Sequence, residues 1–130
     1  MKPNDVDFNQ ERAWWDSKVS QEETDLADER INRLLRWRVI ERYLKDVQTI
    51  LEIGGGIGAF SIPLAQKGLK VVHVDFSTPM IDAAKQKARG TPNIEFLLGS
   101  QCICGSFDRL GIEYGRCNLI LRDWCGESDC

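Results

Sequence analysis

The chain has 130 residues, of which 42% are hydrophobic and 28% charged, as expected of one globular domain with its own core. Its net charge of -3 provides no basic field that would attract nucleic acid or an anionic membrane, so neither is an expected partner. The polar N-terminus and the lack of a long apolar run predict a cytoplasmic protein without a signal peptide or a membrane-spanning helix.

Residues 1–47 are expected to form an N-terminal helical segment. Trp14 and Trp15 stand together in a polar stretch, where they either cap the core from a short helix or belong to a lid over a ligand. The range from Thr24 to Lys45 contains neither proline nor glycine, which predicts one long helix. Its buried face is expected to carry the apolar residues that recur at helical spacing, which are Leu34, Trp37, Ile40 and Leu44.

Residues 48–100 are expected to form the core of the domain. Three apolar stretches predict buried strands at Thr49–Ile53, Leu69–Val74 and Ile94–Leu98. Between them we expect a helix over Ile57–Lys67 and a second helix that begins after a cap at Ser77 or Thr78. Strands that alternate with single helices imply right-handed crossovers, and therefore an α/β fold with a Rossmann-like, doubly wound parallel sheet.

The turn between the first strand and the first helix is rich in glycine and predicts a binding site. In a parallel sheet a ligand binds beyond the carboxyl ends of the strands, and glycines let the backbone of this turn approach it. Asp75 closes the second strand, where a carboxylate can accept hydrogen bonds from both hydroxyls of a ribose. The combination predicts a ligand that contains adenosine.

Two glycine patterns overlap in this turn, and they indicate different ligands. Gly54, Gly56 and Ala59 fit the fingerprint of dinucleotide-binding proteins, whereas an acid followed by alternating glycines, at Glu52 to Gly58, fits a second pattern. A carboxylate just before the glycines suits a ligand with an ammonium and a sulfonium group, and it is unfavourable beside a pyrophosphate. Glu52 therefore favours the second pattern.

With this turn, Asp75 and the following segment FSTPMIDAAKQKA, residues 10–100 resemble the class I S-adenosylmethionine-dependent methyltransferases of the small-molecule type. The resemblance implies that S-adenosyl-L-methionine is the cofactor and that a small molecule accepts the methyl group. In that family the glycine turn holds the methionine part, the acid holds the ribose, and the residue after the acid lies against the adenine. The cofactor-binding residues expected here are Glu52, Gly54, Gly55, Gly56, Gly58, Asp75, Phe76, Ser77 and Ser100.

Two positions in this pattern need comment. Ser100 follows Gly99 where the family usually carries an acid beside the adenine, and its hydroxyl can also donate or accept a hydrogen bond. His73 lies within the second strand among valines, which favours a structural residue over one at the cofactor edge or in catalysis. Because methyl transfer depends on positioning an activated donor, no catalytic residue is assigned.

Residues 101–130 form a tail that contains all five cysteines and is expected to be poorly ordered. Their spacing provides no zinc knuckle, and a chain without a secretion signal predicts no disulfide framework. Cys117–Leu121 predicts a fourth strand, whose exposed edge would favour self-association of the chain.

The resemblance to the family is expected to end at about Ser100, after which the chain looks truncated or frame-shifted. When the codons for Arg109 to Leu121 are read one base later, one choice of permitted codons gives DLVLNMDGAISF. That segment resembles the fourth strand and the following loop of these methyltransferases. We therefore hypothesise that the tail is an out-of-frame translation or reflects a sequencing error, which the nucleotide sequence would test.

Two other functions stay open at this level. One is a fragment of an NAD-linked oxidoreductase, which the spacing of Gly54, Gly56 and Ala59 favours. The other is a non-catalytic binding module or an inert fragment whose sheet edge pairs with another chain. No metal site is expected.

Overall fold

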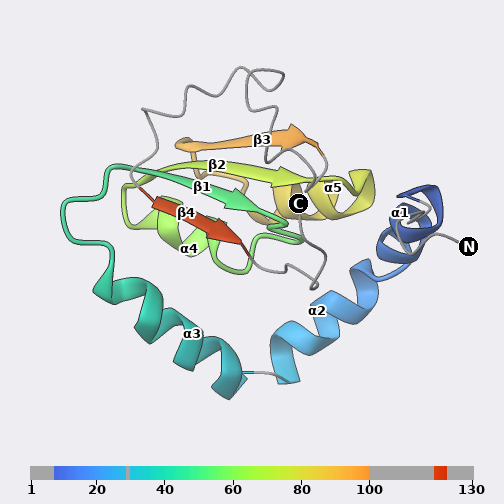
Figure 1. Cartoon of the computed structure of the whole chain (residues 1–130), viewed down its shortest axis with the longest axis horizontal. Coiled ribbons are helices and arrows are strands. Elements are labelled where there is room, and N and C mark those ends of the chain that lie inside the picture. Colours follow the sequence, from blue (N-terminus) through green and yellow to red (C-terminus); the bar gives the residue numbers. More distant parts are fainter. Residues whose placement is uncertain (1–7, 29, 100–118, 123–130) are drawn as a thin grey trace, which may run out of the picture.

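The computed structural model describes residues 8–28, 30–99 and 119–122 (Figure 1). Ser100 and the five cysteines, and with them the expectations for that part of the tail, lie outside this range. The elements in chain order are α1 (Phe8–Asp16), α2 (Val19–Asp28), α3 (Arg30–Arg42), β1 (Thr49–Ile53), α4 (Ser61–Gln66), β2 (Lys70–Asp75), α5 (Thr78–Lys87), β3 (Ile94–Leu98) and β4 (Leu119–Arg122).

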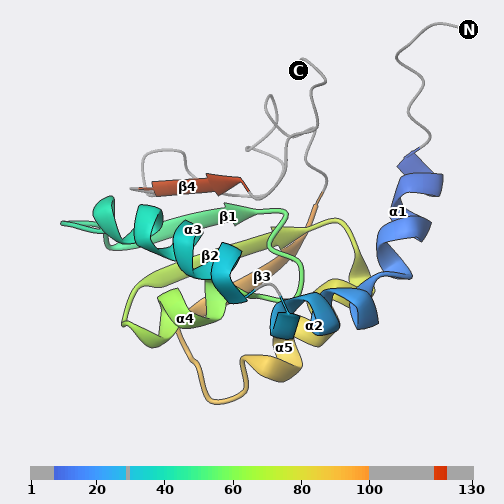
Figure 2. The same ribbon diagram turned by 90° about the horizontal axis from the view of Figure 1, so that it is seen from below.

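The strands form one parallel sheet in the order β3-β2-β1-β4, so the predicted Rossmann-like α/β fold is confirmed. The fourth strand lies one to two residues later than the predicted range Cys117–Leu121, and it pairs with β1. Figure 2 shows α4 and α5 on the same side of the sheet. Within the described sheet β1 is central, and its carboxyl end therefore opens between two neighbouring strands.

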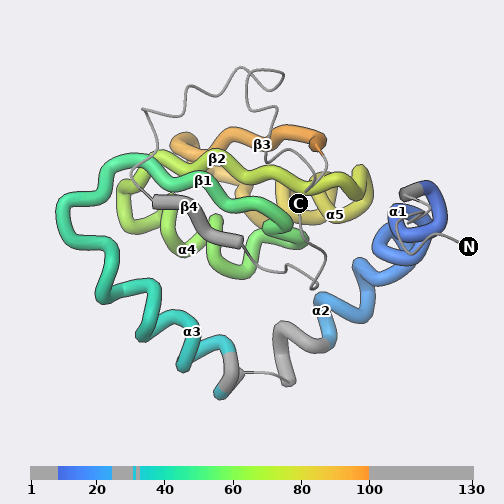
Figure 3. Tube along the Cα trace, viewed as in Figure 1, coloured from blue at the N-terminus to red at the C-terminus, as the bar shows by residue number. Residues whose placement is uncertain are grey.

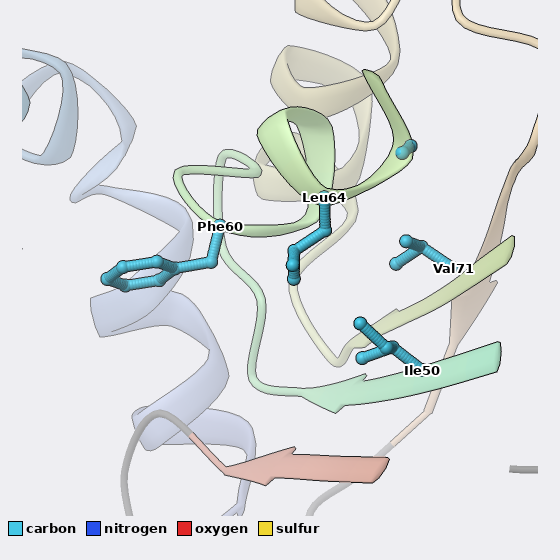
Figure 4. Close-up of a cluster of buried hydrophobic side chains, with 5 residues drawn as sticks. Ile50, Phe60, Leu64 and Val71 are labelled. Carbon is cyan, nitrogen blue, oxygen red and sulfur yellow. The ribbon is translucent and has the colours of Figure 1, made fainter. Parts of the chain in front are cut away.

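A cluster of apolar side chains joins α4 to the sheet. Figure 4 shows Ile50 of β1 and Val71 of β2 pointing towards Leu64 of α4, with Phe60 just before that helix. Trp37 of α3 stacks on Phe60 with the ring centroids 6.2 Å apart. The first residues of the βαβ unit thus share one core with the helix that precedes it.

Alternate residues of a strand face opposite sides of the sheet, which places two different sets of side chains on its two faces. Leu51 of β1 and Val74 of β2 belong to a separate apolar cluster on the other side. The face towards α4 carries Ile50 and Val71 and, two residues further along each strand, Glu52 and His73, which stand opposite each other in the register. Because every second residue of a strand faces the same side of the sheet, Glu52 and His73 lie on the face that α4 covers.

The predicted long helix at Thr24 to Lys45 is wrong in its extent, because the structure has two helices there. α2 ends at Asp28 and α3 begins at Arg30, and the two run in different directions (Figure 1; Figure 3 follows the trace). Since no proline or glycine occurs in this stretch, its sequence gives no local signal for a break.

The predicted buried face of this helix is right for three residues and wrong for Leu34. Trp37, Ile40 and Leu44 pack against the core cluster, whereas the side chain of Leu34 is 57% exposed. Figure 1 shows α3 nearing the sheet towards its C-terminal end, so only its later turns reach the core. The earlier apolar residues stay outside it.

The helix predicted at Ile57–Lys67 begins four residues late, at Ser61. Gly56 and Gly58 have φ values of +54° and +87°, which a right-handed helix does not accommodate. The next helix begins as predicted: Ser77 is its N-cap and its hydroxyl accepts a hydrogen bond from the Met80 backbone N–H.

Across the described residues, no helix is both long and apolar enough to cross a membrane.

Candidate functional site

The glycine turn bends sharply at the carboxyl end of β1. Gly54, Gly56 and Gly58 all have positive φ, with values of +74°, +54° and +87°. Residues other than glycine rarely adopt this left-handed conformation, so the alternating pattern is a backbone requirement. The N–H groups of Gly54 and Gly55 both donate to the carbonyl oxygen of Val74, at 2.8 and 3.2 Å, which holds the turn against the end of β2.

Gly55 is required for a different reason. Its φ is not positive, but a Cβ atom added to it would lie 2.3 Å from Cε1 and 2.4 Å from Nδ1 of His73. Real Cβ contacts are not this short, so the imidazole ring occupies the space under the turn that any other residue would need. The second-strand histidine thereby determines which residue can stand at position 55.

Glu52, Ser61 and His73 form a buried polar cluster below the turn. The Ser61 hydroxyl donates to the Glu52 carboxyl group, and Ser61 Oγ lies 2.9 Å from His73 Nδ1. Because the only hydroxyl hydrogen of Ser61 goes to Glu52, His73 must donate its Nδ1–H to Ser61 Oγ. All three side chains are fully buried, so they bind to one another rather than to a ligand in solution.

The same burial keeps His73 neutral. Burial lowers the pKa of His73 from 6.5 to about 4, against a smaller opposing effect from a hydrogen bond with the Gly56 backbone. A neutral ring fits the tautomer required by Ser61. This geometry supports the structural interpretation of His73.

Asp75 joins the glycine turn to the start of α5. Its Oδ2 accepts a hydrogen bond from the Gly56 N–H and its Oδ1 accepts one from the Ser77 N–H, both at 2.9 Å. The Asp75 carbonyl oxygen also accepts from the Gly99 N–H, which brings the end of β3 to the same place. The next side chain, Phe76, is buried. The glycine turn, the start of α5 and the end of β3 therefore meet at one residue, Asp75.

The N-terminal helices add residues to this site that the sequence patterns do not indicate. Asp16, at the end of α1, accepts a hydrogen bond from the Ser77 hydroxyl at 2.5 Å. Glu22 of α2 approaches the turn, with Oε2 3.8 Å from the position of a Cβ on Gly56. Figures 1 and 2 show α1 and α2 near α5, beyond the carboxyl ends of β1 and β2.

No short motif marks either residue, because both lie in a polar stretch and reach the site only through tertiary packing. The two alternatives for the tryptophans also bear on this segment. Trp14 is 52% exposed and Trp15 is half-buried, and the choice between a cap and a lid stays a prediction.

In residues 8–28, 30–99 and 119–122, no three histidine, cysteine, aspartate or glutamate side chains are placed to hold a metal ion together.

Comparison with known proteins places the chain in a family. A model described as a methyltransferase domain matches residues 50–121, which is more than half of the chain. This match continues past Ser100, where the resemblance was expected to end, and reaches into β4. The in-frame sequence thus matches the family beyond the predicted limit, and the frame-shift hypothesis stays a matter for the nucleotide sequence.

Several relatives are methyltransferases. The demethylmenaquinone methyltransferase of Paenarthrobacter aurescens is 34% identical over 92 residues, which cover 65% of this chain and 35% of that protein. The tRNA 5-carboxymethoxyuridine methyltransferase of Escherichia coli is 31% identical over 74 residues, which cover 52% of this chain and 28% of that protein. The chain therefore spans about a third of the length of these relatives.

A solved structure supports the fold. It is Haemonchus contortus phosphoethanolamine N-methyltransferase 1 in complex with phosphoethanolamine and S-adenosylhomocysteine, with a TM-score of 0.57 and 22% identity. The match covers 71% of this chain and 21% of that one, and at this identity it shows the fold alone. With the family match over residues 50–121, the chain belongs to the methyltransferase domain family, as its resemblance to the class I S-adenosylmethionine-dependent methyltransferases predicts.

Proposed function

We propose that this chain forms the cofactor-binding part of an enzyme that transfers a methyl group from S-adenosyl-L-methionine to a small molecule. One observation carries the proposal. The Asp75 carboxylate lies between the glycine turn and Ser77, the N-cap of α5, and it accepts hydrogen bonds from the backbone N–H groups of Gly56 and Ser77. Each carboxylate oxygen can accept more than one hydrogen bond, so the same group can also receive the two hydroxyls of a ribose.

The other residues fit the parts of the cofactor in the proposed order. The positive-φ turn presents backbone to the methionine part. In the sequence Phe76 and Ser100 follow the ends of β2 and β3, and we assign both to the adenine. Glu52 is buried below the turn, so any effect of its carboxyl group on the ligand acts through the turn and not by direct contact. The residues proposed to hold the cofactor, directly or in the case of Glu52 through the turn, stay Glu52, Gly54, Gly55, Gly56, Gly58, Asp75, Phe76, Ser77 and Ser100.

The cofactor, when bound, supplies an activated methyl group. The chain's own residues then contribute by orienting the donor and by excluding water from it, since a well-oriented donor needs no dedicated acid or base. The described segments supply three such elements: the glycine turn, the Asp75 carboxylate, and the helices α1 and α2 beside them. The proposed division is an N-terminal helical segment that serves as a lid or a cap (1–47), a cofactor-binding core (48–100) and a cysteine-rich tail (101–130).

A small-molecule acceptor is favoured by charge. The relatives include proteins named for demethylmenaquinone, for tRNA and for ribosomal RNA, so the family alone does not select an acceptor. A net charge of -3 gives this chain little attraction for RNA. A cytoplasmic location, no nucleic-acid partner and no membrane partner stay predictions from the sequence.

Membership of a methyltransferase family argues against the NAD-linked alternative, and the structure adds a reason. Glu22 Oε2 lies 3.8 Å from the position of a Cβ on Gly56, so a pyrophosphate at this turn would meet a carboxylate. The remaining rival is a non-catalytic module, which the binding experiment also addresses.

Calorimetric titration of the full chain with S-adenosylhomocysteine and with NADH tests the proposal. We expect S-adenosylhomocysteine to bind and NADH not to bind. The Asp75→Asn variant should weaken binding at least about tenfold, because an amide accepts fewer hydrogen bonds and carries no charge. Asp82→Asn on the exposed side of α5 is the matched control and should bind as the unchanged chain does.

Tight NADH binding would contradict the proposal. A chain that binds neither ligand and whose mass rises with concentration would instead support a non-catalytic module.

A further inference from the structure

Glu22 of α2 reaches the open side of the glycine turn. Its Oε2 lies 3.8 Å from the position that a Cβ on Gly56 would take. Apart from the chain neighbours of Gly56, no other described residue places an atom within 4 Å of that position. Glu22 precedes Gly56 by 34 residues in the sequence, so its position beside the turn is a result of the tertiary fold.

Two contacts with α5 fix the position of this part of the chain. Glu23, the next residue in α2, forms an ion pair with Lys87 in which Oε1 and Nζ are 3.2 Å apart. Asp16 at the end of α1 accepts from the Ser77 hydroxyl. The two neighbouring carboxylates of α2 thus have different surroundings. The Glu23 carboxylate lies against Lys87 of α5, and the Glu22 carboxylate lies beside the glycine turn.

Glu22 and Asp75 approach the same backbone residue from two elements. Asp75 Oδ2 accepts the Gly56 N–H, while the Glu22 carboxylate lies on the side where that residue has no side chain. Two carboxylates near one point favour a ligand that carries a positive charge there, because each lowers the electrostatic energy of a cation. Glu22 is half-buried, so solvent screens its charge less than that of a fully exposed side chain.

We infer that Glu22 is a specificity-determining residue that makes this site bind the positively charged methyl donor more tightly than the neutral product. The inference rests on the proposed function. In methyl transfer the bond between sulfur and the methyl carbon would break with its electron pair left on sulfur, while a lone pair of the acceptor would form the new bond and the acceptor's proton would pass to water. The ligand loses its positive sulfonium charge in this step and otherwise differs only by the methyl group. A carboxylate near the turn therefore raises the affinity of the site for the ligand before transfer more than after it.

The test compares S-adenosyl-L-methionine and S-adenosylhomocysteine as ligands of the full chain by calorimetry. In the Glu22→Gln variant we expect the dissociation constant of S-adenosyl-L-methionine to rise about three- to tenfold, and that of S-adenosylhomocysteine to change by less than about twofold. The ratio of the two constants is the readout, because a purely structural effect on the turn would weaken both ligands alike. High salt should reduce the difference between the ligands in the unchanged chain.

Asp82→Asn is the matched control, since it removes one carboxylate charge from the exposed side of α5 and leaves the ion pair between Glu23 and Lys87 intact. It should alter both dissociation constants equally, if at all. Circular dichroism and thermal unfolding of each variant establish that it is folded. If Glu22→Gln weakens the binding of both ligands equally, or changes the binding of neither, the inference is overturned and the proposed function still stands. If the unchanged chain binds neither ligand, the proposed function fails and this inference fails with it.

Discussion

At the scale of single residues, each glycine of the turn has its own physical reason. Gly54, Gly56 and Gly58 supply positive φ, whereas Gly55 leaves room for the ring of His73. A pattern of alternating glycines predicts the first group, because the requirement is local to the backbone. The sequence pattern cannot predict the reason for Gly55, since the atom that excludes a side chain belongs to the next strand.

Replacing Gly55 by alanine should destabilise the chain. The added Cβ would meet the imidazole of His73, and such overpacking costs about 1–3 kcal/mol of unfolding free energy. Denaturant unfolding of Gly55→Ala, His73→Ala and the double variant measures the coupling between the two sites. Because removing the ring removes the collision, the double variant should be more stable than the sum of the single effects predicts. If the effects of the two single variants simply add, the ring is not the obstacle.

Gly68→Ala is the control, since it adds a Cβ in open space at a positive φ of +93° and so tests backbone strain alone.

The neutral state of His73 predicts a pH dependence of stability. Above pH 6.5 the ring is neutral in both the folded and the unfolded chain, so it has no effect on stability. As the pH falls from 6.5 towards about 4, the unfolded chain binds a proton that the folded chain does not, and stability is lost. The loss reaches about 3 kcal/mol near pH 4.

Denaturant unfolding at several pH values in this range measures that loss, with His73→Gln as the comparison. The variant lacks the titrating ring, so its unfolding free energy should fall less steeply between pH 6.5 and 4. Parallel curves for the two proteins would contradict the lowered pKa.

At the scale of helices and strands, the strands and their connections follow the sequence closely, and the helices follow it less well. Short apolar stretches predicted the ends of β1, β2 and β3 to within one residue. The predicted helix over Thr24–Lys45 divides in two, and Leu34 lies outside the core although its spacing matches that of Trp37 and Ile40. Spacing along a helix shows which residues share a face, but only packing determines how much of that face is covered.

Two alanine substitutions in α3 should therefore differ strongly. Trp37→Ala removes the ring that stacks on Phe60 and should lower the unfolding free energy by about 2 kcal/mol. Leu34→Ala removes a side chain that is already largely in water and should change it by less than about 0.5 kcal/mol. Thermal and denaturant unfolding of both variants provide the comparison. Similar losses in the two variants would mean that α3 packs along its whole length.

At the scale of the whole molecule, the sheet and the N-terminal helices determine how the site is assembled. Asp75 and Ser77 were predictable from their place at the end of a strand and the start of a helix. The approach of Asp16 and Glu22 was not, because it depends on contacts between segments about sixty and thirty residues apart. β4, by contrast, pairs in parallel with β1, and its apolar run predicted a strand without fixing its exact start.

The order of the described strands also predicts self-association. β4 is an edge strand of the described sheet, and a strand at an edge can pair with another chain through its backbone groups. Sedimentation at increasing concentration should give an average mass that rises above the 14.8 kDa of one chain. A constant mass of one chain over the whole range would contradict the prediction.

The Ser77 hydroxyl takes part in two contacts at once. It accepts the Met80 N–H at the start of α5 and donates to Asp16 at the end of α1. Any movement of α1 away from α5 therefore changes the electronic surroundings of one particular amide proton. The Met80 resonance in an amide NMR spectrum becomes a built-in reporter of the N-terminal segment, which can be followed without attaching a label to the moving part.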